Sequence, residues 1–234
     1  MLNDKCRVKN DRRIFCVTTR LVFSFFILHS SCRLAATPRP LANEPLVDIK
    51  SVDPGIVVDL RYATPRNVTD RPLYPPGTPC LVRASVAQRL RFAQFILRKQ
   101  GFGLKIWDGY RPAIVQRALF DFIHNREFIA DPARGALHTW GAAVDATLVD
   151  ARGRDVPMPT DFDEFSKTAR MHYDGTDSIV AKNLDTLQRA MGTGFYGMHG
   201  EWWHFIAKNW RDYGVVRAVP AWELKIQPPV SVTR

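Results

Sequence analysis

The chain carries at positions 138–149 the sequence His138-Thr-Trp-Gly-Ala-Ala-Val-Asp-Ala-Thr-Leu-Val149. Its second part, from Ala143 to Val149, is a mainly apolar run of strand length and predicts a strand. Gly141 allows the backbone to turn tightly just before that strand. An unpaired Asp145 would be costly to bury in such a run, and either a metal ion or an arginine would satisfy its charge.

Hydrophobic periodicity predicts further helices and strands on both sides of this stretch. A helix is expected from Ala84 to Gln100, because apolar residues recur there at helical spacing and Gly101 suits a left-handed C-terminal cap. Asp59 to Thr64 is expected to be an extended segment. The other expected elements are a strand at Leu104–Trp107, a helix that begins at Pro112, a helix from about Val180 to Met191 and a strand at Glu201–Ile206.

The order of these elements predicts the fold class. Strands and helices alternate irregularly, and the strands are too short and sparse for a doubly wound sheet. We therefore expect an α+β domain with a small, mainly antiparallel sheet flanked by helices. The length of 234 residues suits one well-buried domain better than two.

The net charge of +10 is unevenly distributed along the chain. Residues 1–36 contain seven basic and two acidic residues, so about half of the excess positive charge lies there. The rest of the chain is mildly basic and has no long run of lysine and arginine. A solvated surface explains this balance better than a nucleic-acid interface, which would require clustered cations.

The first 36 residues have the pattern of a secretory leader. A basic region runs to Arg20, the apolar run Leu21–Leu28 follows, and small and polar residues come next. The apolar run is about half of what a membrane span requires, so we expect cleavage, export to the periplasm and no stable membrane span afterwards. An uncleaved anchor is the alternative, and lipid attachment at Cys32 is disfavoured by His29 three residues before it. Residues 37–45 are predicted to be a Pro-rich linker, and residues 46–234 a single domain.

The cysteine content of the expected mature domain excludes an internal disulfide and a zinc site built from cysteines. Three of the four cysteines lie in the leader, so the domain keeps only Cys80. A single thiol forms no internal disulfide and excludes a zinc site built from cysteines. Cys80 is therefore expected to be a small buried apolar residue.

Two short patterns contain residues that are able to bind a metal ion. His138 and Asp145 form the first, and Glu201-Trp-Trp-His204 forms the second. Two imidazoles and a carboxylate are the ligand set of a catalytic Zn²⁺, and a further carboxylate suits the general base. On an ideal strand, residues three apart lie on opposite faces, so Glu201 must occupy an irregular turn if both are to reach one site. Gly200 gives the backbone that freedom. Alone, the second pattern also fits a surface glutamate beside a buried histidine.

A third pattern, Trp107-Asp-Gly-Tyr-Arg-Pro112, places Arg111 at the junction between a strand and a helix. Its guanidinium could stabilise the negative charge that develops on a carbonyl under attack. Alternatively, Arg111 pairs with Asp108 for structural reasons.

Five short motifs in order make the chain resemble a known family. They are Leu60-Arg-Tyr-Ala-Thr64, Trp107–Pro112, His138-x-x-Gly-x-Ala-x-Asp145, Met158-Pro-Thr-Asp-Phe-Asp163 and Glu201-Trp-Trp-His204. The chain resembles the zinc D-alanyl-D-alanine dipeptidases, the VanX-like branch of the D,D-peptidase/hedgehog-fold metallopeptidases. The resemblance implies that one Zn²⁺ is held by His138, Asp145 and His204, with Glu201 as catalytic base, Arg111 stabilising the tetrahedral intermediate and Asp163 binding the free ammonium group of the substrate.

The resemblance also implies a reaction. The expected reaction is hydrolysis of D-Ala-D-Ala to two D-alanines by Glu201-assisted attack of zinc-bound water. One alternative is a D,D-carboxypeptidase that acts on longer peptidoglycan stem peptides; another is a non-catalytic zinc-binding module of the same fold. The chain departs from the family pattern at Ala136, where the family commonly has a serine that contacts substrate. His172 and His199 are expected at the surface or beside the site, and Trp202 and Trp203 could wall the pocket.

Overall fold

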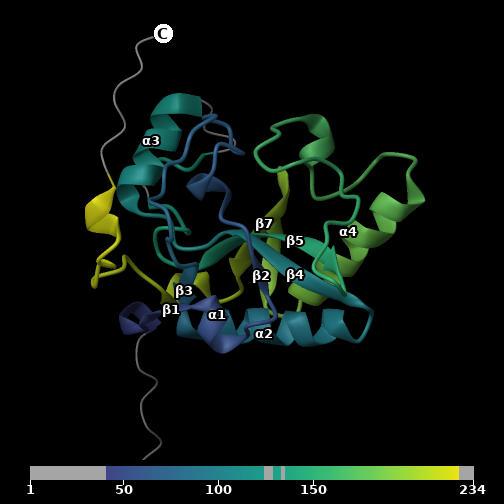
Figure 1. The fold of residues 1–234 in the computed structure, drawn as a ribbon, viewed down its shortest axis with the longest axis horizontal. Coiled ribbons are helices and arrows are strands. Elements are labelled where there is room, and N and C mark those ends of the chain that lie inside the picture. The colour runs from purple at the N-terminus through teal and green to yellow at the C-terminus, as the bar shows by residue number, and fades with distance from the viewer. Residues whose placement is uncertain (1–40, 124–128, 133–134, 227–234) are drawn as a thin grey trace, which may run out of the picture. The chain divides into compact units, whose positions relative to one another are not determined.

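The computed structural model describes residues 41–123, 129–132 and 135–226 of the chain. Its main sheet has five strands in the order β2-β4-β5-β7-β6 (Figure 1). Only β2 and β4 are parallel; the other neighbours in this sheet are antiparallel. The strands of this sheet are β2 (Val57–Val58), β4 (Phe102–Asp108), β5 (Ala143–Asp150), β6 (Phe195–Met198) and β7 (Glu201–Ala207). A separate antiparallel pair is formed by β1 (Leu46–Asp48) and β3 (Leu81–Arg83). The predicted α+β class with a mainly antiparallel sheet is confirmed.

The helices also follow the sequence prediction closely. The described helices are α1 (Ile49–Val52), α2 (Ala84–Arg98), α3 (Ala113–Ile123) and α4 (Ser178–Met191). Gly101, just beyond α2, has the expected left-handed backbone with φ of +79°. At the start of α4, the Asp177 side chain accepts hydrogen bonds from the backbone of Ile179 and Val180. This carboxylate cap explains why the helix begins two residues before the predicted Val180.

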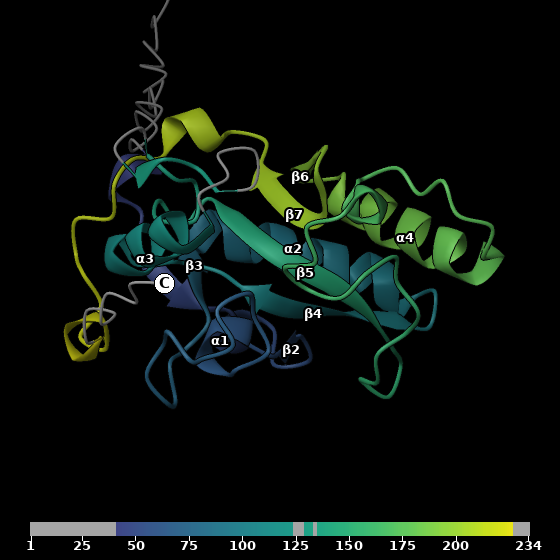
Figure 2. The same ribbon diagram turned by 90° about the horizontal axis from the view of Figure 1, so that it is seen from above.

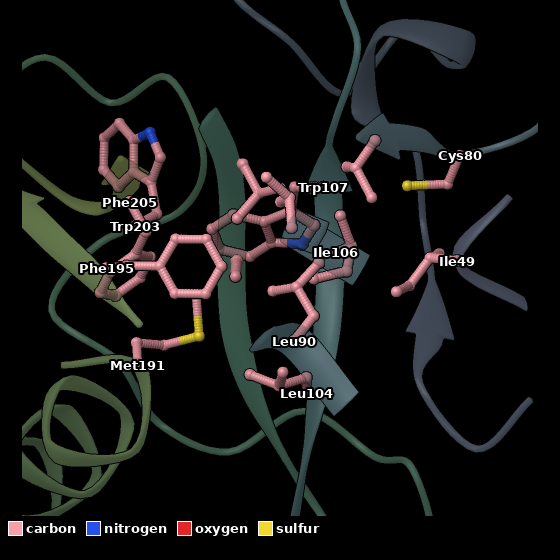
Figure 3. Packing of buried hydrophobic residues seen from close by; sticks show 14 of the residues in the cluster. Ile49, Cys80, Leu90, Leu104, Ile106, Trp107, Met191, Phe195, Trp203 and Phe205 are labelled. Atoms are coloured by element: carbon pink, nitrogen blue, oxygen red, sulfur yellow. The ribbon is translucent and has the colours of Figure 1, made fainter. Parts of the chain in front are cut away.

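The sheet has two chemically different faces. Leu104 and Ile106 of β4 lie opposite Leu148 and Ala146 of β5, and this face packs on α2 through Leu90 (Figure 3). Helix α2 lies behind the strands when the sheet is seen from above (Figure 2). Because side chains alternate along a strand, Asp145, the neighbour of Ala146, points to the other face, where polar groups gather.

The prediction of an extended segment at Asp59–Thr64 is wrong. Arg61–Ala63 instead forms a short 3-10 helix, because the carbonyls of Leu60 and Arg61 accept hydrogen bonds from Ala63 and Thr64. The Arg61 side chain is buried over the ring of Trp107 and pairs with carboxylates on either side. These contacts stabilise the turn. An extended chain would place the Arg61 guanidinium away from the residues that contact it here.

Other expectations concern the ends of the chain and Cys80. Cys80 is buried in the core, as expected, and burial raises the pKa of its thiol far above the ordinary range. The leader, with Cys32, and the first part of the linker lie outside the described residues, so the predicted domain boundaries stay predictions. No helix among residues 41–123, 129–132 and 135–226 is long and apolar enough to cross a membrane.

Candidate metal centre and active site

Two neighbouring strands carry two of the predicted ligands. Asp145 of β5 and His204 of β7 are directly opposite each other in the sheet. Directly opposed side chains lie close together, and here Asp145 Oδ1 is 2.9 Å from His204 Nδ1. The regular pairing of two strands therefore fixes one edge of the site.

The tight turn before β5 positions His138, the third predicted ligand. Gly141 has φ of +67°, which a residue with a side chain rarely adopts, and its N–H donates to the His138 carbonyl at 2.9 Å. His138 Nδ1 lies 2.8 Å from the Gly109 carbonyl, so this nitrogen carries the proton and donates it. His138 Nε2 is left with its lone pair directed at the other two residues, 3.2 Å from His204 Nδ1 and 3.4 Å from Asp145 Oδ1.

The three donor atoms fit a tetrahedrally coordinated metal ion. Their separations of 2.9, 3.2 and 3.4 Å are near the roughly 3.3 Å expected between ligands of a tetrahedral zinc ion. Two imidazole nitrogens and one carboxylate oxygen are a donor set that suits zinc. These residues are His138, Asp145 and His204, the same three that the sequence predicted. They could therefore hold a metal ion.

The charge state of Asp145 also suits a permanent ligand. Burial by itself raises the pKa of Asp145, but the adjacent His138 and His204 lower it more, so the net pKa lies well below the ordinary range. Arg111 Nη2 adds a contact to Asp145 Oδ2 at 3.3 Å. The carboxylate is therefore ionised near neutral pH, as metal binding requires.

Glu201 reaches the same pocket through an irregularity in the sheet. The pairing of β6 with β7 shifts register between Gly197, which faces Phe205, and Met198, which faces Glu201. Glu201 is therefore the first residue of β7 and does not occupy the irregular turn that the sequence predicted. The register shift takes the place of that turn, and Gly200 does not adopt a left-handed backbone. Glu201 Oε2 comes to 3.9 Å from His204 Nδ1.

The Glu201 carboxyl has a pKa shifted toward neutrality. Burial raises the pKa of Glu201 to about 7, and the nearby Asp145 and Asp163 also raise it, while His204 and Arg111 act in the opposite direction. A carboxyl group with a pKa near neutrality is able both to accept and to release a proton in the same reaction. This is the property that the predicted role of catalytic base needs.

Arg111 is held in place by three side chains. Its Nε donates to Asp108 Oδ2 at 2.8 Å, its Nη1 to Gln116 Oε1 at 3.0 Å, and its Nη2 to Asp145. Its guanidinium also lies over the Tyr62 ring, 4.9 Å from the centroid. The structural pairing with Asp108 that competed with a catalytic role is thus present. The two are compatible, because Asp108 binds Nε, and Arg111 still lines the cavity together with Gln116 and Asp145.

Asp163 lies on the long loop between β5 and α4. Its backbone is left-handed with φ of 58°, and its neighbour Phe162 is anchored among Tyr62, Trp107 and Trp203. The carboxylate accepts hydrogen bonds from the Tyr62 hydroxyl at 3.2 Å and the Val68 backbone at 3.1 Å. Burial raises the pKa of Asp163 to about 7; Asp145 raises it further, and Arg111 and the two hydrogen bonds lower it.

All six predicted site residues line one cavity of about 350 Å³. The rest of the cavity lining is largely apolar and includes Ala136, the position where the family pattern has serine. Its apolar members are Ile129, Ala130, Ala136, Leu137, Trp140, Ile206 and Trp210. Trp203 also lines the cavity, whereas Trp202 packs on Trp107 and donates to Thr160. His172 and His199 are exposed and take no part in the three-residue metal cluster.

Sequence reasoning missed three contributors to this site. Asp108 accepts hydrogen bonds from Tyr74 at 2.7 Å and from Arg111, and it lies 3.6 Å from His138 Nδ1. Gln116 and Tyr62 both contact Arg111. The sequence named Asp108 only as a possible structural partner of Arg111. The contacts of Asp108 with Tyr74 and His138, and those of Tyr62 and Gln116 with Arg111, were not predicted.

The comparisons with known proteins agree with this geometry. The family profile described as D-Ala-D-Ala dipeptidase matches residues 42–211. The chain belongs to this family of peptidases. The resemblance predicted from the motifs is therefore confirmed at the level of the family.

Individual relatives have the same description. The D-alanyl-D-alanine dipeptidase of Escherichia coli (strain K12) is 30% identical over 161 residues, covering 68% of this chain and 83% of that protein. The D-alanyl-D-alanine dipeptidase of Enterococcus faecium is 28% identical over 176 residues, covering 66% and 87%. Among solved structures, the chain is distantly similar to a vancomycin resistance D,D-pentapeptidase VanY mutant in complex with Zn(II), with 16% identity and a TM-score of 0.37 over 56% of this chain and 75% of that one.

Proposed function

We propose that this peptidase is a zinc dipeptidase that hydrolyses D-Ala-D-Ala to two D-alanines. The observation that supports the proposal best is the position of Asp163 in the same cavity as the three metal ligands and Glu201. A carboxylate at that place suits a substrate whose free ammonium group lies next to the scissile bond. A dipeptide cleaved at its single peptide bond is such a substrate.

Each residue of the site has a distinct task in this proposal. A Zn²⁺ held by His138, Asp145 and His204 would polarise the scissile carbonyl and make the attacking water more acidic. Glu201 accepts the proton of the attacking water and then delivers it to the leaving amine. Arg111 donates hydrogen bonds to the carbonyl oxygen as negative charge develops on it.

The pair formed by Asp163 and Tyr62 positions the other end of the substrate. The Asp163 carboxylate accepts hydrogen bonds from the ammonium group, and the Tyr62 hydroxyl at 3.2 Å holds that carboxylate in place. Binding the ammonium group replaces the proton that Asp163 retains near neutral pH. The free energy of binding therefore depends on a free N-terminus, and a longer peptide would leave this carboxylate without a cation.

The test is an assay of four peptides with and without a zinc chelator. D-Ala-D-Ala should be hydrolysed and the chelator should abolish the activity, with L-Ala-L-Ala as the stereochemical control. N-acetyl-D-Ala-D-Ala, which lacks the ammonium group, should be hydrolysed at least about tenfold more slowly, as expected for loss of a charged hydrogen bond. Faster turnover of a stem pentapeptide than of D-Ala-D-Ala would instead identify a D,D-carboxypeptidase. Stoichiometric zinc without any activity would identify a non-catalytic module.

We also propose that the protein is exported and acts in the periplasm. The leader pattern of residues 1–36 supports this proposal. N-terminal sequencing of the protein recovered from cells should find cleavage near residues 31–37. An intact Met1 would leave the uncleaved anchor as the explanation of the apolar run.

A further inference from the structure

The outer face of α2 carries a stripe of exposed aromatic side chains. Phe92 is 54% exposed and Phe95 is 50% exposed, and their rings stack with centroids 6.4 Å apart. Gln88 and Lys99 extend the stripe at helical spacing in the two directions. Single exposed apolar residues are ordinary, but two large rings side by side form a patch, and such a patch indicates an interaction surface.

Cations flank this stripe on both sides. Helix α2 contains no acidic residue, and Arg91 and Arg98 follow one side of the stripe at a spacing of seven. On the other side, Arg89 and Lys208 border a hollow of about 490 Å³ that begins at Phe92.

Few acidic groups of the described chain neutralise these cations. Arg98 pairs with Asp53 at 2.6 Å. The described residues place no carboxylate within 4.0 Å of Arg89, Arg91, Lys99 or Lys208. Lys99 Nζ instead lies 4.2 Å from the centre of the Phe95 ring, so the aromatic stripe and the positive charge form one surface.

We propose that this face of α2 binds the surface of a bilayer that contains anionic phospholipid. The two rings would enter the boundary between headgroups and acyl chains, and the flanking cations would contact lipid phosphates. A soluble polyanion would satisfy the cations but would leave the rings in water. A second copy of the chain would place the cations of the two α2 helices against each other and is disfavoured by their repulsion.

The placement of α2 allows binding to the bilayer and hydrolysis at the same time. The inner side of α2 packs on the face of the sheet that carries Leu104 and Ile106, whereas Asp145 points to the opposite face. A bilayer bound to the outer side of α2 would therefore lie on the side of the sheet opposite to Asp145, since α2 lies behind the strands in Figure 2. This inference is independent of the substrate proposed above.

The first experiment measures binding of the full-length chain to lipid vesicles by sedimentation. Vesicles of phosphatidylcholine with phosphatidylglycerol should bind the protein, and vesicles of phosphatidylcholine alone should bind it at least about tenfold more weakly. Replacing both rings by serine (Phe92→Ser with Phe95→Ser) should weaken binding about tenfold or more. The charge reversals Arg91→Glu with Lys99→Glu should weaken it similarly and flatten its dependence on salt.

Two variants on α4 are matched controls. Ile179→Ser removes an apolar side chain that is 60% exposed, and Lys182→Glu reverses an exposed cation. Neither should change binding by more than about twofold, and hydrolysis of D-Ala-D-Ala should be equal in all four proteins. Equal vesicle binding by the ring variant and the Ile179 control would overturn the proposal.

A second measurement separates α2 from the apolar run of the leader, which is present in every full-length variant. Hydroxyl-radical labelling of the Phe92 and Phe95 rings should fall several-fold when anionic vesicles are added. Labelling of Leu224, which is 84% exposed, should not change. Unchanged labelling of the two rings would overturn the proposal, and protection that depends on protein concentration without lipid would assign the face to a second copy of the chain.

Discussion

Asp145 and Asp163 are carboxylates of the same cavity whose pKa values are shifted in opposite directions. Asp145 lies on a strand between two histidines, which hold its pKa well below the ordinary range despite burial. Asp163 lies on a loop, where burial raises its pKa to about 7 because its two hydrogen bonds and Arg111 compensate only in part. The first is ready for a permanent cation, and the second is suited to a cation that arrives with each substrate and leaves again.

Glu201 belongs with Asp163 in this comparison. Its pKa is also raised to about 7, and it lies outside the regular ladder, at the register shift between β6 and β7. The metal ligands Asp145 and His204 are opposed in a regular ladder. Regular pairing thus holds two of the three residues that could bind a metal ion, whereas the two carboxyl groups with raised pKa values lie at a register shift and on a loop.

The same substitution at the two aspartates should have different consequences. Asp145→Asn removes a ligand and places an amide N–H against His204 or Arg111, so zinc affinity should fall by more than about 100-fold and activity should disappear with it. Asp163→Asn should retain zinc and lower kcat/KM for D-Ala-D-Ala by about 10–100-fold, as expected for a charged hydrogen bond. Zinc competition titration and steady-state kinetics measure both. Equal loss of zinc from the two variants would contradict the division of roles.

Glu201→Gln should separate metal binding from proton transfer. The amide is unable to accept the proton of water, so kcat should fall by about 10²–10⁴-fold while zinc content is unchanged. Glu164→Gln is the matched control, because Glu164 is an exposed glutamate beside Asp163. A variant at position 201 that retains zinc and the wild-type rate would exclude Glu201 as the base.

Asp108→Asn should weaken the support of Arg111 without removing Arg111 itself. Asp108 is fully buried and accepts hydrogen bonds from Arg111 Nε and the Tyr74 hydroxyl, so we expect kcat to fall about 10–100-fold with little change in KM. Tyr74→Phe removes one of these bonds and should cost about 2–10-fold.

A double-mutant cycle checks whether Asp108 acts through Arg111. In the background of Arg111→Ala, the further change Asp108→Asn should have little effect on kcat, because the group that it positions is gone. Additive effects of the two substitutions on kcat would show that Asp108 stabilises the fold in general and does not position Arg111.

Features that depend on residues close together in the sequence could be predicted, and contacts between residues far apart in the sequence could not. The helix α2 and the strand β5 follow from local periodicity, and the left-handed Gly101 and Gly141 follow from their places beside these elements. The ligands follow from residue type and from the order of motifs. In each case the prediction uses either a short stretch of neighbouring residues or a motif that the chain has in common with the family.

The supporting contacts have no such local signal. The hydrogen bond from Tyr74 to Asp108 joins residues 34 positions apart, and that from Tyr62 to Asp163 joins residues 101 apart. The turn at Arg61–Ala63 was predicted to be extended because its mixed pattern does not reveal that Arg61 is buried over Trp107. The fold determines these pairings, and their residue types alone do not.

The raised pKa of Asp163 should be visible in the stability of the metal-free protein. Between the ordinary aspartate pKa of 3.8 and about 7, folded Asp163 retains a proton that the unfolded chain releases. Stability therefore falls as pH rises through this range, and the full cost is present above pH 7. Asp163→Asn removes this cost. The difference in melting temperature between the variant and wild type should therefore increase from pH 5 to pH 8, by about 2–4 °C for each kcal/mol that ionisation of Asp163 costs the folded protein. Thermal unfolding in chelator at the two pH values measures it, and a constant difference would contradict the raised pKa.

Ala136→Ser tests the apolar wall of the cavity and should have the smallest effect. Ala136 is 4% exposed and lines the cavity beside His138, at the place where the family pattern has serine. One new hydrogen bond to the carboxylate of the substrate should lower KM for D-Ala-D-Ala about 2–10-fold and leave kcat unchanged, since ground state and transition state gain equally. D-alanyl-D-alaninamide, which lacks the carboxylate charge, is the control, and the improvement should largely vanish with it. The same improvement on both substrates would place the new hydroxyl away from the carboxylate, and recognition of that end of the dipeptide would then depend on the apolar wall alone.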